Sequence, residues 1–264
     1  MTVPESMTSP SEPLLSVEGP VATITLNRPA HRNRLEVGDL RALLRHFAQI
    51  DADPGIRVLT LTAHTQGQPR PVFCSGYHIG SFDSDGDDPG LFERVADALA
   101  ALRPITVCAL NGSVYGGATD LMLACDLCVA LADIEFRMPA AALGLHYYPS
   151  GLQRYVARLG ASGAKRAFLS ARPFTAERLW RMGCLEEIAD AADFDEAVAR
   201  LVAEVADLAP LAVQATKKSL NEIAQGRIDM KALREREAMT AQSRDFAEGR
   251  EAFKERRKPR FSGS

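Results

Sequence analysis

Two segments of this 264-residue chain place glycines directly after an apolar run, a pattern that exposes backbone N–H groups. In the first, Val72-Phe73-Cys74 is followed by Ser75-Gly76-Tyr77. In the second, the apolar run 105–110 stops at Asn111-Gly112, and Gly116-Gly117 precede apolar residues at helical spacing. The first N–H groups of a helix have no partner within it, and the helix dipole favours negative charge there. Two such donors that converge would form an oxyanion hole, stabilising a developing oxyanion by roughly 3 kcal/mol per donor.

Further side chains that could transfer protons lie close to the second segment in the sequence. Asp120 falls in the first turn of the predicted helix, where a carboxylate acts either as an acid/base or only as a favourable partner of the helix dipole. His146, Tyr147 and Tyr148 follow some 25 residues later. The two tyrosines are either functional or form an aromatic wall with satisfied hydroxyl groups.

The elements that position these residues are predicted from hydrophobic periodicity. A hairpin over 14–26 is followed by a helix over 40–50, a strand over 56–63 and a helix over 91–102. Two short strands, 127–130 and 134–136, close the strand-rich half. The remainder is predicted to be helical, in the ranges 150–159, 161–170, 176–182, 194–207, 210–224 and 229–244. The pattern predicts an α/β fold whose C-terminal part is all helix.

Taken together, the motifs resemble those of the crotonase superfamily, which includes the enoyl-CoA hydratases. Phe73-Cys-Ser-Gly-Tyr-His-Ile79 is similar to the F-x-x-G-x-D-I segment of that family, and Ala109-Leu-Asn-Gly-Ser-Val-Tyr-Gly-Gly-Ala-Thr-Asp-Leu121 to its A-x-N-G-x-x-x-G-G-G-x-E-L segment. Cys125-Asp126 matches the C-D after the following helix, and Gln153-Arg154 continues the register. Near the end, Glu248-Gly-Arg-Glu-Ala-Phe253 and Arg257-Lys-Pro-Arg-Phe261 match a further signature, so the resemblance spans about residues 14–261.

The resemblance implies a spiral of ββα units with a C-terminal helical trimerisation region. The expected division is a loose tail over 1–13, an acyl-CoA-binding core over 14–206 and an oligomerisation region over 207–264, assembled as a homotrimer or as a hexamer of two trimers. Coenzyme A would enter as part of a thioester substrate, with no permanently bound cofactor. The carbonyl oxygen would lie between the N–H groups of Tyr77 and Gly117, and the basic C-terminal residues near the CoA phosphates. The residues expected to contact substrate are Cys74, Ser75, Gly76, Tyr77, His78, Gly116, Gly117, His146 and Tyr148.

The chain departs from the family pattern at the residues that carry the hydration chemistry. The two glutamates that hold and activate water in the hydratases would fall at Asp120 and Ala140, and an alanine transfers no proton. The aspartate usual after the first oxyanion donor is His78. Tyr147 falls where methylmalonyl-CoA decarboxylases of the superfamily carry a tyrosine. The expected catalytic residues are therefore Tyr77, Gly117, Asp120 and Tyr147.

Three functions remain open from these residues. The first is enoyl-CoA hydratase/isomerase chemistry with Asp120 as acid/base. The second is decarboxylation of a malonyl-type CoA ester with Tyr147 orienting the carboxylate. The third is acyl-CoA binding without turnover, which is suggested by Ala140 at the position of the second catalytic glutamate.

Composition argues against other classes of partner. The net charge of −3 offers no basic face to nucleic acid or to a membrane surface, and no apolar run approaches the ~20 residues of a membrane span. The five cysteines are odd in number, and Cys125-x-x-Cys128 has no second pair, which favours buried thiols over a metal site. The N-terminal segment lacks the features of a signal or transit peptide, so a cytoplasmic location is expected. The acidic stretch 81–90 is interpreted as a loop, or alternatively as a lid over substrate.

Overall fold

The structure is a computed structural model that describes residues 11–77, 88 and 90–264, and it confirms the predicted α/β fold. Its larger sheet has the strand order β1-β2-β3-β5-β7-β10. β1 and β2 form the predicted antiparallel hairpin, and the other neighbours in this sheet pair in parallel. The strands of this sheet are β1 (Leu14–Glu18), β2 (Val21–Leu26), β3 (Val58–Ala63), β5 (Ile105–Leu110), β7 (Leu127–Leu131) and β10 (Glu187–Ala189).

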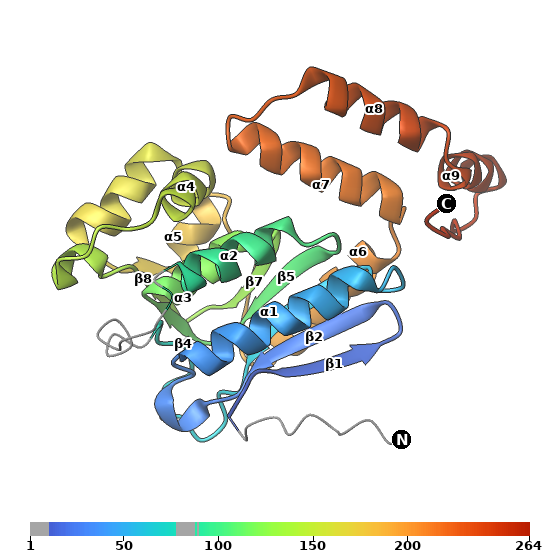
Figure 1. Ribbon diagram of the computed structural model, residues 1–264. Coiled ribbons are helices and arrows are strands. Elements are labelled where there is room, and N and C mark those ends of the chain that lie inside the picture. The colour runs from blue at the N-terminus through green and yellow to red at the C-terminus, as the bar shows by residue number, and fades with distance from the viewer. Residues whose placement is uncertain (1–10, 78–87, 89) are drawn as a thin grey trace, which may run out of the picture.

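Helices cover both faces of this sheet (Figure 1), which explains why its central strands read as continuous apolar runs. On one face lie α1 (Val37–Ala52), α2 (Leu91–Ala101) and α3 (Gly117–Ala124), packed with Leu59 and Cys108 in the main core. On the other face α6 (Phe194–Ala206) packs with Val58 and Val107. The alternation of side chains along β3 and β5 therefore serves two separate apolar layers.

A second, smaller sheet has the order β4-β6-β8-β9, and the sequence predicted it only in part. Its strands are β4 (Val72–Cys74), β6 (Ser113–Tyr115), β8 (Glu135–Arg137) and β9 (Phe174–Thr175). Strand β6 was missed because it has only three residues, enclosed between Gly112 and Gly116. It pairs in parallel with β4, so the two glycine-containing segments lie on adjacent strands.

The C-terminal helices follow the prediction at one place and differ from it at another. Residues 149–170 form α4 (Pro149–Ser170), whose backbone leaves the helical region at Gly160 (φ 66°, ψ 166°), so the break falls between the predicted helices 150–159 and 161–170. The predicted helix 229–244 was wrong at its end, because α8 (Met230–Ala241) stops and α9 (Arg244–Glu255) begins. The Ser243 hydroxyl accepts the N–H of Phe246 and so caps the new helix.

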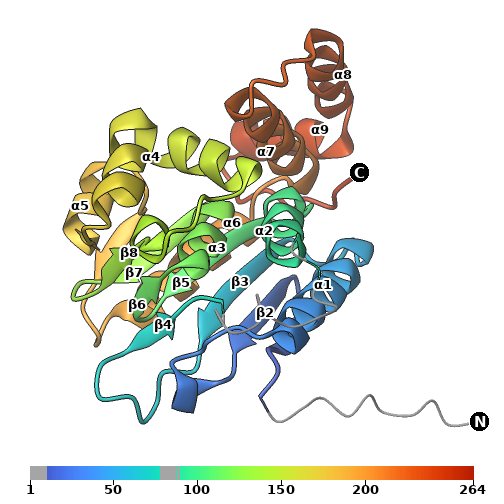
Figure 2. The ribbon, with the colours of Figure 1, turned by 60° about the vertical axis from the view of Figure 1, so that its left-hand side comes forward.

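Helices α7 (Pro210–Ala224), α8 and α9 lie outside the sheet-and-helix layers (Figures 1 and 2). A buried cation joins α7 to the rest of the fold, because Lys217 Nζ donates to the Pro104 carbonyl oxygen at 2.8 Å and lies 2.7 Å from Asp126 Oδ2. α6 ends at Ala206, and α7 begins at Pro210. Within the described ranges, none of the helices is long and apolar enough to cross a membrane.

The remaining predictions on these elements have mixed outcomes. All five cysteines are free and buried, as expected for packing residues. The tail residues 1–10, His78 and most of the acidic stretch 81–90 lie outside the described residues. The small helix α5 (Ala176–Arg181) follows the predicted range 176–182, with the Thr175 hydroxyl accepting the N–H of Arg178.

Candidate active site

The two glycine-containing segments are in direct backbone contact. A Cβ atom placed on Gly76 would lie 2.9 Å from the Tyr115 carbonyl oxygen and 3.5 Å from the Gly117 nitrogen. Gly76 also has a φ of +100°, which a residue with a side chain rarely adopts. Only glycine therefore allows the segment 74–77 to lie this close to the start of α3.

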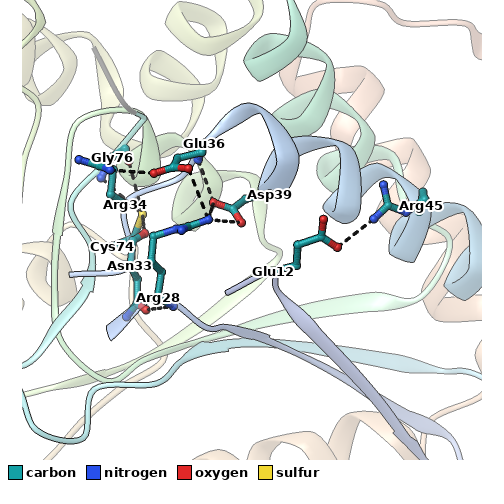
Figure 3. A network of polar contacts seen from close by, with 9 residues as sticks. All are labelled: Glu12, Arg28, Asn33, Arg34, Glu36, Asp39, Arg45, Cys74 and Gly76. Carbon is teal, nitrogen blue, oxygen red and sulfur yellow. Dashed lines mark hydrogen bonds and ion pairs between the residues drawn. The ribbon is translucent and has the colours of Figure 1, made fainter. Parts of the chain in front are cut away.

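Hydrogen bonds to the residues that follow β2 also hold the segment 74–77 in place. The N–H of Leu35 donates to the Gly76 carbonyl oxygen at 2.9 Å, and the N–H of Ser75 donates to the Arg32 carbonyl oxygen at 2.9 Å. The Cys74 thiol donates to the Asn33 carbonyl oxygen (Figure 3). Burial raises the pKa of this thiol to about 12, so Cys74 supports the segment as a neutral group.

A network of charged groups stabilises the residues that hold this segment (Figure 3). Arg28 Nη2 lies 3.1 Å from both carboxylate oxygens of Asp39, and the N–H of Glu36 donates to Asp39 Oδ2 at 2.9 Å. The Arg28 N–H donates to the side-chain oxygen of Asn33, and the amide of Asn33 donates to the His64 carbonyl oxygen at 2.9 Å. Burial raises the pKa of Asp39 although Arg28 opposes the shift.

Phe92 of α2 closes one side of the start of α3. A Cβ atom on Gly117 would lie 2.7 Å from Phe92 Cζ, so the aromatic ring rests on the glycine itself. The centroid of the Phe92 ring is 5.9 Å from that of Tyr77 and 6.3 Å from that of Tyr148. The helix start is thus enclosed by aromatic rings from three parts of the chain.

Asp120 lies beneath this aromatic wall and is fully buried. Arg154 of α4 donates from Nε to Asp120 Oδ1 and from Nη2 to Asp120 Oδ2, each at 2.9 Å. Oδ2 also accepts the hydroxyl hydrogen of Tyr148. Arg154 extends further to Asp97 of α2, whose Oδ1 is 3.2 Å from Nη1. One arginine therefore joins three helices around a buried carboxylate.

Tyr147 and Tyr148 are stacked, with ring centroids 4.2 Å apart. The Tyr147 hydroxyl donates to that of Tyr148 at 3.0 Å. Gly151 makes room for the pair, because a Cβ atom there would lie 2.4 Å from Tyr147 Cε1 and 2.7 Å from Tyr148 Cε2. Burial, followed by the charge of Asp120, raises the pKa of both hydroxyl groups, so both stay protonated.

The other residues expected to contact substrate differ in burial and in distance along the chain from the start of α3. His146 is exposed on the loop before α4, and Gly116 precedes the first residue of α3. Ala140 is buried at the start of a short 3₁₀ helix (Ala140–Leu143). Cys74 is fully buried and its thiol donates to the Asn33 carbonyl oxygen, so this residue supports the segment and offers no exposed surface to a ligand.

Sequence reasoning missed the roles of Arg154 and Phe92. Gln153-Arg154 matches the family pattern, but the match alone assigns the arginine no partner. Its ion pair with Asp120 joins residues 34 positions apart, on helices whose packing no local pattern reveals. In the sequence, Phe92 is one of several apolar residues of an amphipathic helix. The one signal for its role is Gly117, which has no side chain and therefore leaves space for an aromatic ring.

Known proteins share both the sequence pattern and this architecture. The family model described as enoyl-CoA hydratase/isomerase matches residues 16–264. The 2,3-dehydroadipyl-CoA hydratase of Escherichia coli is 28% identical over 262 residues, covering 96% of this chain and 99% of its own length. The methylmalonyl-CoA decarboxylase of the same organism is 25% identical over 252 residues, covering 92% and 95%.

A solved structure shows the same fold over nearly the whole chain. The enoyl-CoA hydratase from Bacillus anthracis superimposes with a TM-score of 0.84 at 23% identity, covering 96% of this chain and 100% of that one. With the family model spanning both glycine segments and Asp120, this chain belongs to the enoyl-CoA hydratase/isomerase family and has the crotonase fold.

Proposed function

We propose that this chain is an enzyme that acts on acyl-CoA thioesters through a thioester enolate held by the N–H groups of Tyr77 and Gly117. The contact between Gly76 and the Gly116–Gly117 backbone carries the proposal, because it brings the amide that follows Gly76 next to the start of α3. The free N–H groups and dipole of a helix start favour an anion. Preorganised amides of this kind provide a large share of the rate enhancement wherever negative charge develops on an oxygen atom.

Asp120 is the acid/base of the proposed reaction. Ordinary hydration uses a pair of carboxylates, and the position expected for the second one is Ala140, which has only a methyl group. A reaction that needs one proton-transfer group, such as moving the double bond of an enoyl-CoA or exchanging its α-proton, fits this residue set better. We therefore propose that the chain catalyses an isomerase reaction rather than the hydration catalysed by other members of the family.

A second candidate is decarboxylation of a malonyl-type CoA ester. The similarity to methylmalonyl-CoA decarboxylase and the hydroxyl of Tyr147 on the same aromatic wall favour it. Loss of CO₂ leaves its electron pair on the α-carbon, so the same amides would hold the enolate and no base would be needed. Tyr147 would then orient the leaving carboxylate.

The test is a panel of CoA thioesters incubated in D₂O and read by mass spectrometry and absorbance. Exchange-type chemistry predicts uptake of deuterium into butanoyl-CoA and conversion of a 3-enoyl-CoA to the conjugated 2-enoyl-CoA, with Asp120→Asn removing both. Decarboxylation predicts loss of CO₂ from methylmalonyl-CoA, which Asp120→Asn spares and Tyr147→Phe reduces. A chain that is thermally stabilised by butanoyl-CoA but changes no thioester would be a binding protein and would overturn the proposal.

We further propose that residues 207–264 assemble the chain as a homotrimer or a hexamer. Apolar side chains on these helices and on the segments that connect them are exposed in the single chain, which is typical of an interaction surface. They are Leu208, Leu220, Ile223, Ile228, Met230, Met239, Phe246 and Phe253. Light scattering is expected to give a multiple of three times the chain mass of 28.6 kDa, and a monomer at micromolar concentration would contradict this.

A further inference from the structure

The side chain of Asp120 has no solvent-exposed surface, so it exchanges protons only through a neighbouring group. It is fully buried, and both oxygens are occupied by Arg154. Among the described residues, the one further side chain that bonds to its carboxylate is Tyr148, through its hydroxyl group. Arg154 holds its proton over the whole accessible pH range: burial would lower its pKa, but the bonds to Asp120 outweigh this and raise it. Tyr148 is thus the neighbour through which a proton reaches Asp120.

Tyr148 links Asp120 to the aromatic rings around the start of α3. It is only partly buried, and its ring lies beside Phe92, whose own ring rests on Gly117. Its hydroxyl group donates to Asp120, and its hydroxyl oxygen accepts from Tyr147. A phenol oxygen has two lone pairs, so one remains to accept a hydrogen from a bound molecule.

We propose that Tyr148 is the catalytic residue that exchanges a proton with the substrate carbon and relays it to Asp120. This inference rests on the function proposed above and specifies the group that touches the substrate. In the forward step the α-carbon–hydrogen bond breaks and its proton binds the Tyr148 oxygen, while the original hydroxyl proton of Tyr148 moves to Asp120 Oδ2. The electron pair of the broken bond becomes the enolate, and the negative charge passes from Asp120 to the oxyanion. Protonation of the enolate is the reverse.

The surroundings favour a relay over ionisation of the tyrosine. Burial and the charge of Asp120 both oppose a phenolate at this position, and they raise the pKa of Tyr148. In the relay, one proton arrives at the Tyr148 oxygen as another departs, so the residue stays neutral. Arg154 holds the carboxylate in one orientation, so that Oδ2 faces the hydroxyl group.

The experiment compares Tyr148→Phe with a matched Tyr155→Phe control, using deuterium uptake from D₂O into butanoyl-CoA. Tyr155 lies on α4, which begins directly after Tyr148, and it is buried, but its hydroxyl bonds to Thr119 rather than to Asp120. Tyr148→Phe keeps the stacked ring and is expected to lose exchange by at least about a hundredfold. Tyr155→Phe is expected to keep the wild-type rate, and both variants should bind butanoyl-CoA as the wild type does.

The double variant Asp120→Asn/Tyr148→Phe tests whether the two groups act in series. Groups that form one relay give losses that do not add, so the double variant should be no slower than the slower single variant. Exchange that survives in Tyr148→Phe while Asp120→Asn abolishes it would overturn the relay but leave the proposed function standing. Absence of exchange and of any other turnover in the wild type would instead refute the proposed function, and the relay with it.

Discussion

The Asp120 carboxylate and the Arg154 guanidinium form a bidentate ion pair in the interior, with two N–O distances of 2.9 Å. Asp120 is fully buried, and only 10% of the Arg154 side chain is exposed. The pair joins α3, which begins at the proposed anion site, to α4, whose start lies next to the two tyrosines. Because both charges are removed from water, each depends on the other for compensation.

Arg154→Met is expected to lower the free energy of unfolding by about 3–5 kcal/mol, because it leaves the buried Asp120 charge uncompensated. Urea unfolding followed by circular dichroism measures the change. The control is the double variant Asp120→Asn/Arg154→Met, in which neither charge of the pair remains. It should be more stable than Arg154→Met alone, and a double variant as destabilised as the sum of the single ones would contradict a coupled pair.

Gly151→Ala tests the packing of the two tyrosines. A methyl group there would lie 2.4 Å from the Tyr147 ring, so we expect a loss of about 1–3 kcal/mol in spite of the better helix propensity of alanine. Gly249→Ala is the matched control in α9, where the new Cβ would lie 3.6 Å from Phe261, an ordinary contact. That variant should gain about 0.5–1 kcal/mol. Equal effects of the two substitutions on the unfolding midpoint would refute the tyrosine packing.

The hydrogen bonds from Arg257 and Arg260 to Glu248 hold the C-terminal segment on α9, and we expect acid to weaken them. Hydrogen bonds from Arg257, followed by the N–H of Arg260, lower the pKa of Glu248 from 4.5 to about 2. A lowered pKa in the folded state means that the stabilisation is complete above the unfolded value of 4.5 and is lost as the pH falls through about 2. At low salt, the difference in Tm between the wild type and Glu248→Gln should therefore shrink between these values. A difference that is constant with pH would show that the charge of Glu248 contributes nothing.

Local pattern predicted the elements that surround the site. The turn at Gly116-Gly117, the helix that carries Asp120 and strand β5 all lie where periodicity and glycine chemistry put them. Strand β6 and the start of α9 were missed, because three residues give no measurable period and because a capping serine inside a polar stretch resembles many others.

The contacts that give the site its chemistry depend on tertiary packing. Asp120 and Arg154 are 34 residues apart, and their pairing follows from how α3 packs on α4. The sequence singled out Asp120, Tyr147 and Tyr148, which the structure joins by hydrogen bonds, but it could not indicate that Asp120 is enclosed or that the hydroxyl of Tyr148 bonds to it. That order of groups depends on side-chain directions that sequence spacing leaves open.

The N–H group of Gly117 offers the most direct test of the proposed anion site. Proline is tolerated at the first position of a helix and lacks an N–H, so Gly117→Pro deletes the donor and keeps α3. Gly117→Ala keeps the N–H and adds a Cβ, and both variants are made with Phe92→Leu to remove the ring that a Cβ would meet at 2.7 Å.

The decisive measurement is the rate of deuterium uptake into butanoyl-CoA by these two variants, at matched thermal stability. If the Gly117 amide stabilises the enolate, the proline variant should be slower than the alanine variant by about a hundredfold to a thousandfold. Equal rates in the two folded variants would contradict an anion site at the start of α3.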